Sequence, residues 1–499
     1  EYWQCGEWAA CTNIQQARTC TDTNSCGTVA DRPPLSQACQ ASSTCTEDWA
    51  CGAWSACTGG SMVRTCGDRS ACGTVTNKPA EQFVCSGGQV PGSDTVAPNS
   101  VITSAPAARQ PLNQAAATWT GVDDQTGANQ LQYSYQLDSR SWSSWSTATR
   151  KTFYRLRNGP HTIRVKSRDV AGNEDPTPAV VSFTITTPYT IVAAPRQSGP
   201  QVRLLDTAGK LLGQFFAYEQ TFRGGVVVAS GDGGGDGREE LIVAPGPGRA
   251  ADVRIFRRNS SLITSFLAYP RPFSGGVSVA AADVNGDGSD EIVTAPQGGG
   301  GPNVRVFGFR GTGYAPIYPG FMAYDTRFRG GVSVTRCDIE GDGTDEIVTG
   351  TLSGGNQVKV FGLRNGSFRL LTPAFAAFHP LFRGGVTVAC GDVNADGSDE
   401  IVVGVAGDSA PLVRVYGRTP QGKISLQSSF TAFNPSFRGG VSVATLYTGS
   451  DPAAKIVVAV RSNSESVVRY FNASGTQVIR QIIAWPKSYL RGIDISTIH

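Results

Sequence analysis

Five copies of one short motif, spaced almost evenly through the C-terminal part of the chain, limit the fold more than any other feature. They are "FRGGVVVAS" at Phe222, "FSGGVSVAA" at Phe273, "FRGGVSVTR" at Phe328, "FRGGVTVAC" at Phe382 and "FRGGVSVAT" at Phe437. The steps between these phenylalanines are 51, 55, 54 and 55 residues. A repeat of that length holds four short strands, which is the size of one β-propeller blade.

The order within each repeat predicts how many blades there are and how the ring closes. An apolar strand such as "EIVTAP" occurs six times, at Ile191, Ile242, Ile292, Ile347, Ile401 and Ile456. The first copy has no "RGGVSVA" strand before it, whereas the last repeat is followed by a lone version, "LRGIDIS", at 490–496. We therefore predict a six-bladed β-propeller over residues 188–499. The two ends of this domain complete one blade and leave no free edge at the seam.

An acidic loop of nine residues lies between two strands of most repeats. The carboxylates of "DVNGDGSDE", at 283–291, would repel one another unless a cation lay among them. Ca²⁺ takes about six to eight oxygen ligands, and side-chain oxygens at loop positions 1, 3, 5 and 9 with a carbonyl at position 7 can supply them. The ligands predicted for three loops are Asp283, Asn285, Asp287, the Ser289 carbonyl and Glu291; Asp338, Glu340, Asp342, the Thr344 carbonyl and Glu346; and Asp392, Asn394, Asp396, the Ser398 carbonyl and Glu400.

Two other loops depart from this pattern. "DGGGDGREE" keeps Asp232, Asp236 and Glu240 but has Gly at position 3, so we expect a degenerate fourth site with weaker binding or none. "YTGSDPAAK" has Tyr447 and Lys455 at its two ends, and we predict that it binds no metal.

Several alternatives to this assignment of ligands are open. The aspartates at position 8 stand beside Glu at position 9 as rival ligands: Asp290, Asp345 and Asp399. Mg²⁺ fits less well than Ca²⁺, because the pattern would remove most of the water that Mg²⁺ retains. An EF-hand is excluded because strands, not helices, flank the loop. The loops could also be solvated acidic turns without an ion.

These blades resemble the FG-GAP and VCBS repeats of integrin α-chains and of many bacterial surface proteins, over roughly residues 188–499. The resemblance lies in the acidic loop and the strands on both sides of it, which recur together. It implies a calcium-binding β-propeller that takes part in adhesion or recognition outside the cell.

The first 90 residues contain a second kind of repeat. Five cysteines recur after 46 residues: Cys5, Cys11, Cys20, Cys26 and Cys39 correspond to Cys51, Cys57, Cys66, Cys72 and Cys85. Such density predicts two disulfide-rich modules, at 1–45 and 46–90, and an oxidising compartment. Cys45 has no counterpart, so at least one cysteine is unpaired or bonded to another chain. A zinc site is a weaker interpretation, because CxxC pairs and nearby His are absent.

These two modules resemble thrombospondin type 1 repeats, in which Trp rings interleave with Arg side chains on a thin three-stranded ribbon. The segments "WQCGEWAACTNIQQARTC" and "WACGAWSACTGGSMVRTC" carry the resemblance. It implies layers built from Trp3, Trp8 and Arg18 in the first module and from Trp49, Trp54 and Arg64 in the second. The modules would either take part in extracellular adhesion or act as a rigid stalk.

The middle of the chain, after a linker at 91–98, alternates apolar and polar residues between turns rich in Gly, Asn and Pro. This pattern over residues 99–187 predicts a β-sandwich. It resembles bacterial immunoglobulin-like or fibronectin type III-like domains, chiefly through "LQYSYQLDSRSWSSW" and "GPHTIRVKSRDVAGNEDPTPA". Such domains usually act as spacers.

The composition argues against several classes of function. The chain has 43 basic and 40 acidic residues, so it lacks the basic excess that nucleic-acid binding requires. No apolar run approaches the roughly 18 residues of a membrane span. Only three His are present and no catalytic signature is visible, so we predict a non-enzymatic protein without catalytic residues. The chain opens on Glu1 without Met or a signal sequence, so we expect a mature or excised chain.

Three further features carry smaller expectations. The sequons at Asn259, Asn365 and Asn472 fall in predicted hairpins, as surface glycosylation requires. Cys337 and Cys390 either form a bridge between neighbouring blades or stay buried and free. The arginines of the "FRGG" motifs could bind an anion, but we expect them to pair with carboxylates on adjacent strands: Arg223, Arg329, Arg383 and Arg438.

The sequence as a whole predicts an all-β protein that is secreted or attached to the cell surface. Its function would be calcium-dependent adhesion to, or recognition of, a protein or glycan on a cell or matrix surface. The first alternative is the subunit of a homopolymeric extracellular filament or coat, built by head-to-tail contacts. The second alternative is a carbohydrate-active enzyme. The many carboxylates of this chain leave room for a catalytic pair of acids of the glycosidase kind, which the sequence does not single out.

Overall fold

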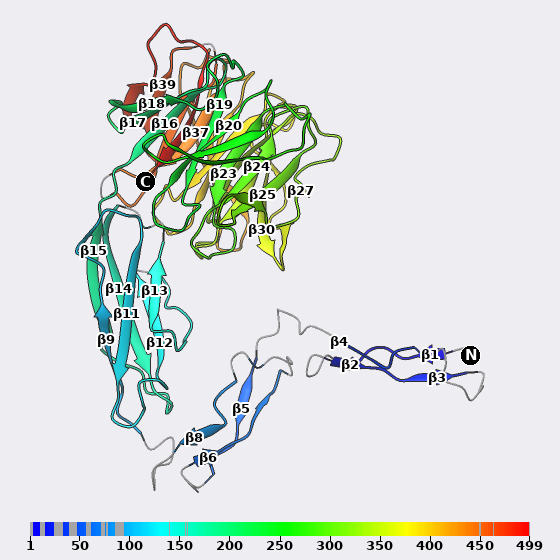
Figure 1. Ribbon diagram of the computed structural model, residues 1–499, viewed down its shortest axis with the longest axis vertical. Coiled ribbons are helices and arrows are strands. Elements are labelled where there is room, and N and C mark those ends of the chain that lie inside the picture. The colour runs from blue at the N-terminus through cyan, green and yellow to red at the C-terminus, as the bar shows by residue number, and fades with distance from the viewer. Residues whose placement is uncertain are drawn as a thin grey trace. The chain divides into compact units, whose positions relative to one another are not determined.

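The computed structural model describes residues 3–9, 15–23, 33–38, 47–55, 61–70, 75, 78–84, 94–138, 140–154, 156, 158–448, 451–462 and 464–498. Every regular element in this part of the chain is a β-strand, which confirms the all-β class (Figure 1). No helix among the described residues is long and apolar enough to cross a membrane. Seven of the N-terminal cysteines lie outside the described residues: Cys11, Cys26, Cys39, Cys45, Cys57, Cys72 and Cys85.

The two N-terminal modules share one arrangement of short antiparallel strands. Those of the first module are β1 (Trp3–Cys5), β2 (Gln15–Ala17), β3 (Cys20–Asp22) and β4 (Ser36–Ala38), and those of the second are β5 (Trp49–Cys51), β6 (Ser61–Val63), β7 (Cys66–Asp68) and β8 (Gln82–Val84). β1 pairs with β3 and β2 with β4, and the second module repeats both pairings. The disulfides Cys5–Cys20 and Cys51–Cys66 join the corresponding strands.

Cationic side chains lie over Trp rings in both modules. The guanidinium of Arg18 lies 4.3 Å from the ring centre of Trp8, and that of Arg64 lies 4.4 Å from the ring centre of Trp54. Lys78 lies 5.6 Å from the ring centre of Trp49. Stacked cations and a disulfide stabilise modules that have few buried apolar side chains.

Residues 99–185 form two sheets, which we call the two-sheet region. One sheet has the order β10 (Arg109–Gln110), β15 (Ala179–Ile185), β14 (Gly159–Arg168), β12 (Gln132–Leu137), and the other has the order β13 (Arg150–Phe153), β11 (Ala115–Val122), β9 (Asn99–Ser104). Buried and exposed side chains alternate along β11 and β14. The ring of Tyr135 on β12 contacts the rings of Trp119 and Phe153 from the other sheet, so aromatic side chains fill the space between the sheets.

Residues 190–498 form six sheets among the described residues, which we call the six-sheet region and number by chain order (green to red in Figure 1). The first sheet contains β18 (Leu211–Phe216), β17 (Gln201–Asp206), β16 (Thr190–Pro195) and β41 (Ile493–Ile498). The second contains β19 (Val226–Gly231), β20 (Glu240–Pro245), β21 (Asp252–Phe256) and β22 (Leu262–Leu267). The third contains β23 (Val277–Ala282), β24 (Glu291–Pro296), β25 (Asn303–Phe309), β26 (Tyr314–Pro316) and β27 (Phe321–Met322).

The other three sheets repeat this plan. The fourth contains β28 (Val332–Cys337), β29 (Glu346–Thr351), β30 (Gln357–Arg364), β31 (Ser367–Leu370) and β32 (Phe375–Ala376). The fifth contains β33 (Val386–Gly391), β34 (Glu400–Val405), β35 (Leu412–Arg418) and β36 (Ile424–Thr431). The sixth contains β37 (Val441–Leu446), β38 (Lys455–Val460), β39 (Val467–Phe471) and β40 (Val478–Ile483). Asn259, Asn365 and Asn472 lie in hairpins of the second, fourth and sixth sheets.

The first sheet is built from both ends of the region. β41 pairs antiparallel with β16, from Thr190 opposite Ile498 to Pro195 opposite Ile493. The "LRGIDIS" strand thus takes the place that an "FRGG" strand takes in the other sheets. The edge strands contact one another in the order β41, β19, β23, β28, β33 and β37, and β37 contacts β41 again.

A cationic side chain joins each of the six sheets to the one before it. On the strand after the "EIVTAP" strand, an Arg or Lys donates to the carbonyl of an Ala just beyond the outer strand of the preceding sheet, at 2.6–2.9 Å. The pairs are Arg203 to Ala484, Arg254 to Ala217, Arg305 to Ala268, Lys359 to Ala323, Arg414 to Ala377 and Arg469 to Ala432. The same cations lie over aromatic rings, as Arg203 does over Trp485 at 4.9 Å.

Burial follows the position of each strand within its sheet. All six residues of β24, β29 and β34 are buried, because neighbouring sheets cover both of their faces. The outer strands β18, β22 and β36 alternate exposed and partly buried residues instead. The apolar runs in the sequence therefore mark the strands within the core.

A disulfide between Cys337 and Cys390 joins the edge strands of the fourth and fifth sheets. Both cysteines are buried, so the bridge crosses the packed interface between the two sheets. The choice between a bridge and two free thiols is thus resolved in favour of the bridge.

Candidate metal centres

The acidic loops lie between the first two strands of four consecutive sheets. The loop at 232–239 joins β19 to β20, and the corresponding loops join β23 to β24, β28 to β29 and β33 to β34. Gly286 and Gly288, at positions 4 and 6 of the loop at 283, have φ of 74° and 92°. Side chains disfavour this left-handed backbone, and glycine allows the chain to fold back on itself there.

The position-1 aspartate organises each loop by accepting hydrogen bonds from its backbone. In the loop at 283, Asp283 Oδ1 accepts from the N–H of Asp287 at 3.1 Å and Oδ2 accepts from the N–H of Gly288 at 2.9 Å. The position-1 aspartates of the other three loops accept from the same two positions: Asp232, Asp338 and Asp392. The carboxylate is thus held inside the loop.

The side chains at positions 3, 5 and 9 converge in two loops. Asn285 Nδ2 donates to Asp287 Oδ2 at 3.0 Å and to Glu291 Oε1 at 3.2 Å. Asn394 makes the same two bonds, to Asp396 and Glu400, at 2.9 and 2.8 Å. A polar hydrogen therefore lies between two carboxylates, where positive charge is favoured.

The backbone of the residues at position 7 is held by the aspartate at position 5. The N–H groups of Ser289, Thr344 and Ser398 donate to the aspartate at position 5 of their own loops, each at 2.8 or 2.9 Å. In the first loop, Arg238 makes this bond to Asp236, and Gly233 N–H donates to Glu240 at 3.2 Å. Gly234 offers no side chain there.

The loop at 338 differs in its third position. Glu340 forms ion pairs with Arg364 at 2.8 Å and with Arg418 at 3.1 Å. Its charge is already balanced by two guanidinium groups, so it is a less suitable ligand than Asn285 or Asn394. The sequence alone gave no sign of these partners.

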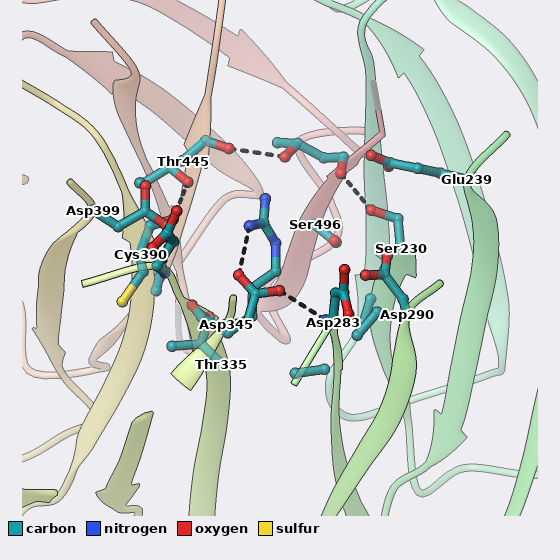
Figure 2. Close-up of a pocket in the computed structure, with 18 of the residues that line it drawn as sticks. Ser230, Glu239, Asp283, Asp290, Thr335, Asp345, Cys390, Asp399, Thr445 and Ser496 are labelled. Carbon is teal, nitrogen blue, oxygen red and sulfur yellow. Dashed lines mark hydrogen bonds and ion pairs between the residues drawn. The ribbon is translucent and has the colours of Figure 1, made fainter. Parts of the chain in front are cut away.

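The position-8 aspartates, which are the alternative ligands, connect adjacent sheets. Asp345 Oδ2 accepts from the N–H of Asp283 at 2.8 Å, and Asp345 N–H donates to the Asp283 carbonyl at 2.9 Å (Figure 2). Asp290 and Asp399 make the same pair of contacts with Asp232 and Asp338. These carboxylates face the loop of the preceding sheet, so they act as links between sheets.

The fifth loop carries its own cation. Lys455, at position 9, forms an ion pair with Asp451, at position 5. The other four loops have Glu at position 9. Residues 449 and 450 of this loop lie outside the described residues. The hydroxyl of Tyr447 takes over the link to the preceding sheet, because it accepts from Asp392 N–H at 3.2 Å.

The position-9 glutamates lie beside other carboxylates, and all of them except the partly buried Glu240 are buried. Burial, followed by repulsion from Asp232 and Asp236, raises the pKa of Glu240 to about 7. Burial, followed by repulsion from neighbouring carboxylates, raises the pKa of Glu346 and Glu400 to about 8 and that of Asp338 to about 7. A donor set of buried oxygens that repel one another fits a hard divalent cation, which would favour the ionised carboxylates.

The arginines of the "FRGG" motifs do not pair with carboxylates as expected. The side chains of Arg223, Arg329, Arg383 and Arg438 each donate to two carbonyls of their own turn, such as those of Thr326 and Phe328 for Arg329. They stabilise the turn between the outer strand of one sheet and the edge strand of the next. The Phe before the arginine in this motif also packs against an aromatic ring, as Phe328 does against Tyr324.

A polar pocket lies among the edge strands of the six sheets (Figure 2). Ser230 donates to the Thr497 carbonyl, Thr497 to the Thr445 carbonyl, and Thr445 to the Cys390 carbonyl, at 2.5–2.8 Å. Carboxylates also line it, among them Asp345 and Asp399. These hydroxyls and carboxylates mainly serve contacts between neighbouring sheets.

The comparisons with known proteins identify the repeats. A family model described as an FG-GAP-like repeat matches residues 232–294 and 338–403, which contain all four acidic loops with carboxylates at positions 1, 5 and 9. No curated protein sequence matches the chain. The chain thus contains FG-GAP-like repeats in a propeller-like repeat fold. Such repeats and disulfide bonds are typical of extracellular proteins.

Several solved structures are distantly similar. A rhamnogalacturonan lyase of Bacillus licheniformis is 14% identical, with 78% of this chain and 69% of that chain covered and a TM-score of 0.33. A quinonprotein alcohol dehydrogenase-like protein of Bacteroides thetaiotaomicron is 10% identical, with 80% and 98% covered and a TM-score of 0.32. The biofilm matrix protein Bap1 of V. cholerae is 19% identical, with 53% and 40% covered and a TM-score of 0.30.

Proposed function

We propose that this chain is an extracellular, non-enzymatic adhesion or recognition protein whose six-bladed β-propeller is stiffened by Ca²⁺. Two thrombospondin type 1-like modules and an immunoglobulin-like or fibronectin III-like sandwich accompany the propeller. The ligand is a protein or glycan of a cell or matrix surface. The ions occupy the loops at Asp283, Asp338 and Asp392, and the loop at Asp232 holds a weaker fourth site.

The repeated contacts between sheets support the six-bladed ring. Six cationic side chains each reach the preceding sheet, and the contact from Arg203 to Ala484 connects the first sheet to the sixth. An open array of sheets would leave two ends without such a partner. A closed ring also explains why β41 completes the first sheet.

The observation that carries the calcium proposal is the ion pair between Lys455 and Asp451. Where the acidic loop lacks carboxylates at both ends, an ammonium group of the protein pairs with the remaining aspartate. The other loops keep buried carboxylates at the same positions, and in those loops a bound cation would provide the equivalent positive charge. The ions would act by cancelling repulsion within the turn.

The outer strands of the propeller support a binding role. Large apolar side chains are exposed on the outer strand of several sheets: Leu211, Leu212, Phe216, Leu262, Leu267, Met322, Leu370, Leu426, Val478, Ile479 and Ile483. Exposed apolar side chains that recur on the outer strands give these strands a surface able to contact another protein. This surface also favours the second candidate function, a filament in which copies of this chain associate through their outer strands.

The calcium proposal is tested by counting bound ions on the full chain. Asp283→Asn, Asp338→Asn and Asp392→Asn are each expected to lower the Ca²⁺ content by one ion, measured by elemental analysis after equilibrium dialysis. Asp451→Asn is the matched control and should leave the content unchanged. Equal content in all five proteins would contradict the assignment of these loops.

The recognition role is tested by binding to immobilised glycans and matrix proteins with and without Ca²⁺. The wild-type chain should bind a restricted set of ligands in Ca²⁺ and lose this binding in chelator. Sedimentation separates the two candidates, because a filament subunit forms large assemblies without any added ligand. Release of product from polysaccharides by the purified chain would instead favour the carbohydrate-active enzyme.

A further inference from the structure

Three aspartates meet where strands of the two-sheet region begin and end. Asp94 precedes β9, and Asp123 and Asp124 directly follow β11. One carboxylate oxygen from each residue lies within 4.8 Å of the other two. They belong to neither the FG-GAP-like repeats nor the acidic loop pattern. Acidic residues often cluster without binding a metal ion. The hydrogen-bond partners of each carboxylate oxygen therefore decide whether a cation fits here.

Local backbone contacts account for only half of the oxygens of Asp94 and Asp123. Asp94 Oδ1 accepts from the N–H of Val96 at 3.0 Å, and Asp123 Oδ2 accepts from the N–H groups of Gln125 and Thr126 at 3.1 and 2.6 Å. Such bonds are common where aspartate shapes a turn. The second oxygen of each carboxylate needs another explanation.

The remaining oxygens are buried without a hydrogen-bond partner in the described part of the chain. They are Asp94 Oδ2 and Asp123 Oδ1. Asp94 as a whole is only 8% exposed. A buried carboxylate oxygen without a donor is costly, and two of them close together repel each other. Two buried oxygens without donors, on neighbouring carboxylates of one group, indicate that a positively charged partner fits there.

In the described part of the chain, the donors to the carboxylates of Asp94 and Asp123 are backbone N–H groups, and the Asn173 amide donates to the Asp94 backbone carbonyl. None of these donors carries a positive charge. Burial raises the pKa of Asp94, and repulsion from Asp123, Asp124 and Asp169 raises it further. The cluster therefore favours the uptake of either a proton or a metal ion.

The backbone around the cluster is held in place by neighbouring groups. Asn173 Nδ2 donates to the Asp94 carbonyl at 3.0 Å and to Asp169 Oδ2 at 2.7 Å. Asp169 also accepts from the N–H groups of Gly172 and Asn173. The turn after β14 thus fixes the segment that carries Asp94. Less reorganisation is needed for binding when the donor groups are already positioned.

We propose that Asp94, Asp123 and Asp124 bind a hard divalent cation, Ca²⁺ in an extracellular setting, through oxygens that include Asp94 Oδ2 and Asp123 Oδ1. Asp124 is exposed, so water can complete the coordination on its side. The ion connects the segment before β9 to the end of β11. Because sites in extracellular modules are weak, we expect a dissociation constant of about 0.1–1 mM.

Local hydrogen exchange on the full chain tests this site separately from the propeller loops. Adding about 5 mM Ca²⁺ to chelator-treated protein should slow exchange of peptides covering 94–98 and 121–126 by about tenfold, as expected when the ion is at about ten times its dissociation constant. Asp94→Asn and Asp123→Asn should abolish this slowing, leave the Ca²⁺ response of the loops at 283, 338 and 392 intact, and lower the ion content by one.

A matched control and a second variant keep the test decisive. Glu174→Gln removes a nearby exposed carboxylate that pairs with Lys166, and it should retain the Ca²⁺ response. If Asp94→Asn disturbs folding, seen as faster exchange of β11 without Ca²⁺, the exposed Asp124→Asn replaces it. Failure of Ca²⁺ to protect these peptides in the wild type would overturn the proposal and indicate that protons neutralise the cluster.

Discussion

Arg203 donates from its guanidinium to the backbone carbonyl of Ala484 at 2.9 Å, although 281 residues separate them in sequence. The same contact recurs at every other junction between sheets, where its partners are only 36 or 37 residues apart. The junction between the first and sixth sheets therefore has the same chemistry as the others. What differs is that its two sides come from opposite ends of the region.

Replacing Arg203 tests whether this junction holds the ring closed. Arg203→Met should lower the free energy of unfolding by about 1–3 kcal/mol, because it removes a charged hydrogen bond and a cation over the Trp485 ring. Urea unfolding of the full chain measures the loss, and hydrogen exchange should rise first in β16 and β41. Arg327→Met, at an exposed arginine, is the control and should change stability by less than about 0.5 kcal/mol. Equal stability of the two variants would contradict the closure.

The link between Asp345 and Asp283 gives a second test. Asp345→Ala should cost about 1–3 kcal/mol of stability in Ca²⁺-free buffer, since it leaves the buried Asp283 N–H without its carboxylate acceptor and removes the ion pair with Arg336. Asp345→Asn keeps an acceptor oxygen and should cost less. Asp325→Ala, in an exposed turn of the neighbouring repeat, serves as control. A loss no greater than that of the control would show that the link contributes little.

The disulfide between Cys337 and Cys390 should stabilise the six-sheet region by restricting the unfolded chain. The closed loop spans 53 residues, and bridges of this size contribute about 2–4 kcal/mol. A Cys337→Ala/Cys390→Ala double variant should unfold at lower urea concentration than the wild type. Reductant should not change hydrogen exchange in the fourth and fifth sheets of the double variant. In the wild type, reduction should increase hydrogen exchange in β28 and β33. No difference in that exchange would argue against the bridge.

The periodic features of the fold could be predicted from the sequence, because they depend on local pattern. The "FRGG" steps and the "IVTAP" strands predicted a six-fold repeat, and "LRGIDIS" predicted the strand that pairs with β16. The proximity of Asp283 and Glu291 could also be predicted from local sequence, because both belong to one nine-residue segment. Binding of Ca²⁺ to these residues is still a prediction.

Contacts between repeats were missed because their partners lie a whole repeat apart. The role of Asp345 depends on Asp283, and the pairing of Glu340 depends on Arg364 and Arg418, and neither loop alone reveals this. The sequence does contain a sign of the contacts between sheets. A basic residue recurs at one position of "NVRVFG" and of the corresponding strand in each repeat. The site at Asp94 and Asp123 had no such repeat and needed the folded backbone to bring its residues together.

The pair formed by His161 and Asp138 should make the stability of the two-sheet region depend on pH. Burial opposes ionisation of Asp138, but hydrogen bonds from His161 Nδ1 and Thr162 N–H, both at 2.8 Å, outweigh it and lower the pKa of Asp138 below its ordinary value. A lowered pKa stabilises the folded state above the unfolded value of about 3.9 and loses this effect as the pH falls through the folded value. The stability gap between wild type and Asp138→Asn should therefore be present above about pH 4 and should shrink as the pH falls below that value.

Pulsed hydrogen exchange of the peptide covering 132–137 across a urea series, at about pH 7, 5 and 3, measures this gap. Glu174→Gln is a suitable control, because its carboxylate lies on the surface of the same region. A gap that stays constant down to about pH 3 would mean that the interaction with Asp138 does not depend on its charge. A shrinking gap would identify the carboxylate between β12 and β14 as the group whose protonation loosens this region in acid.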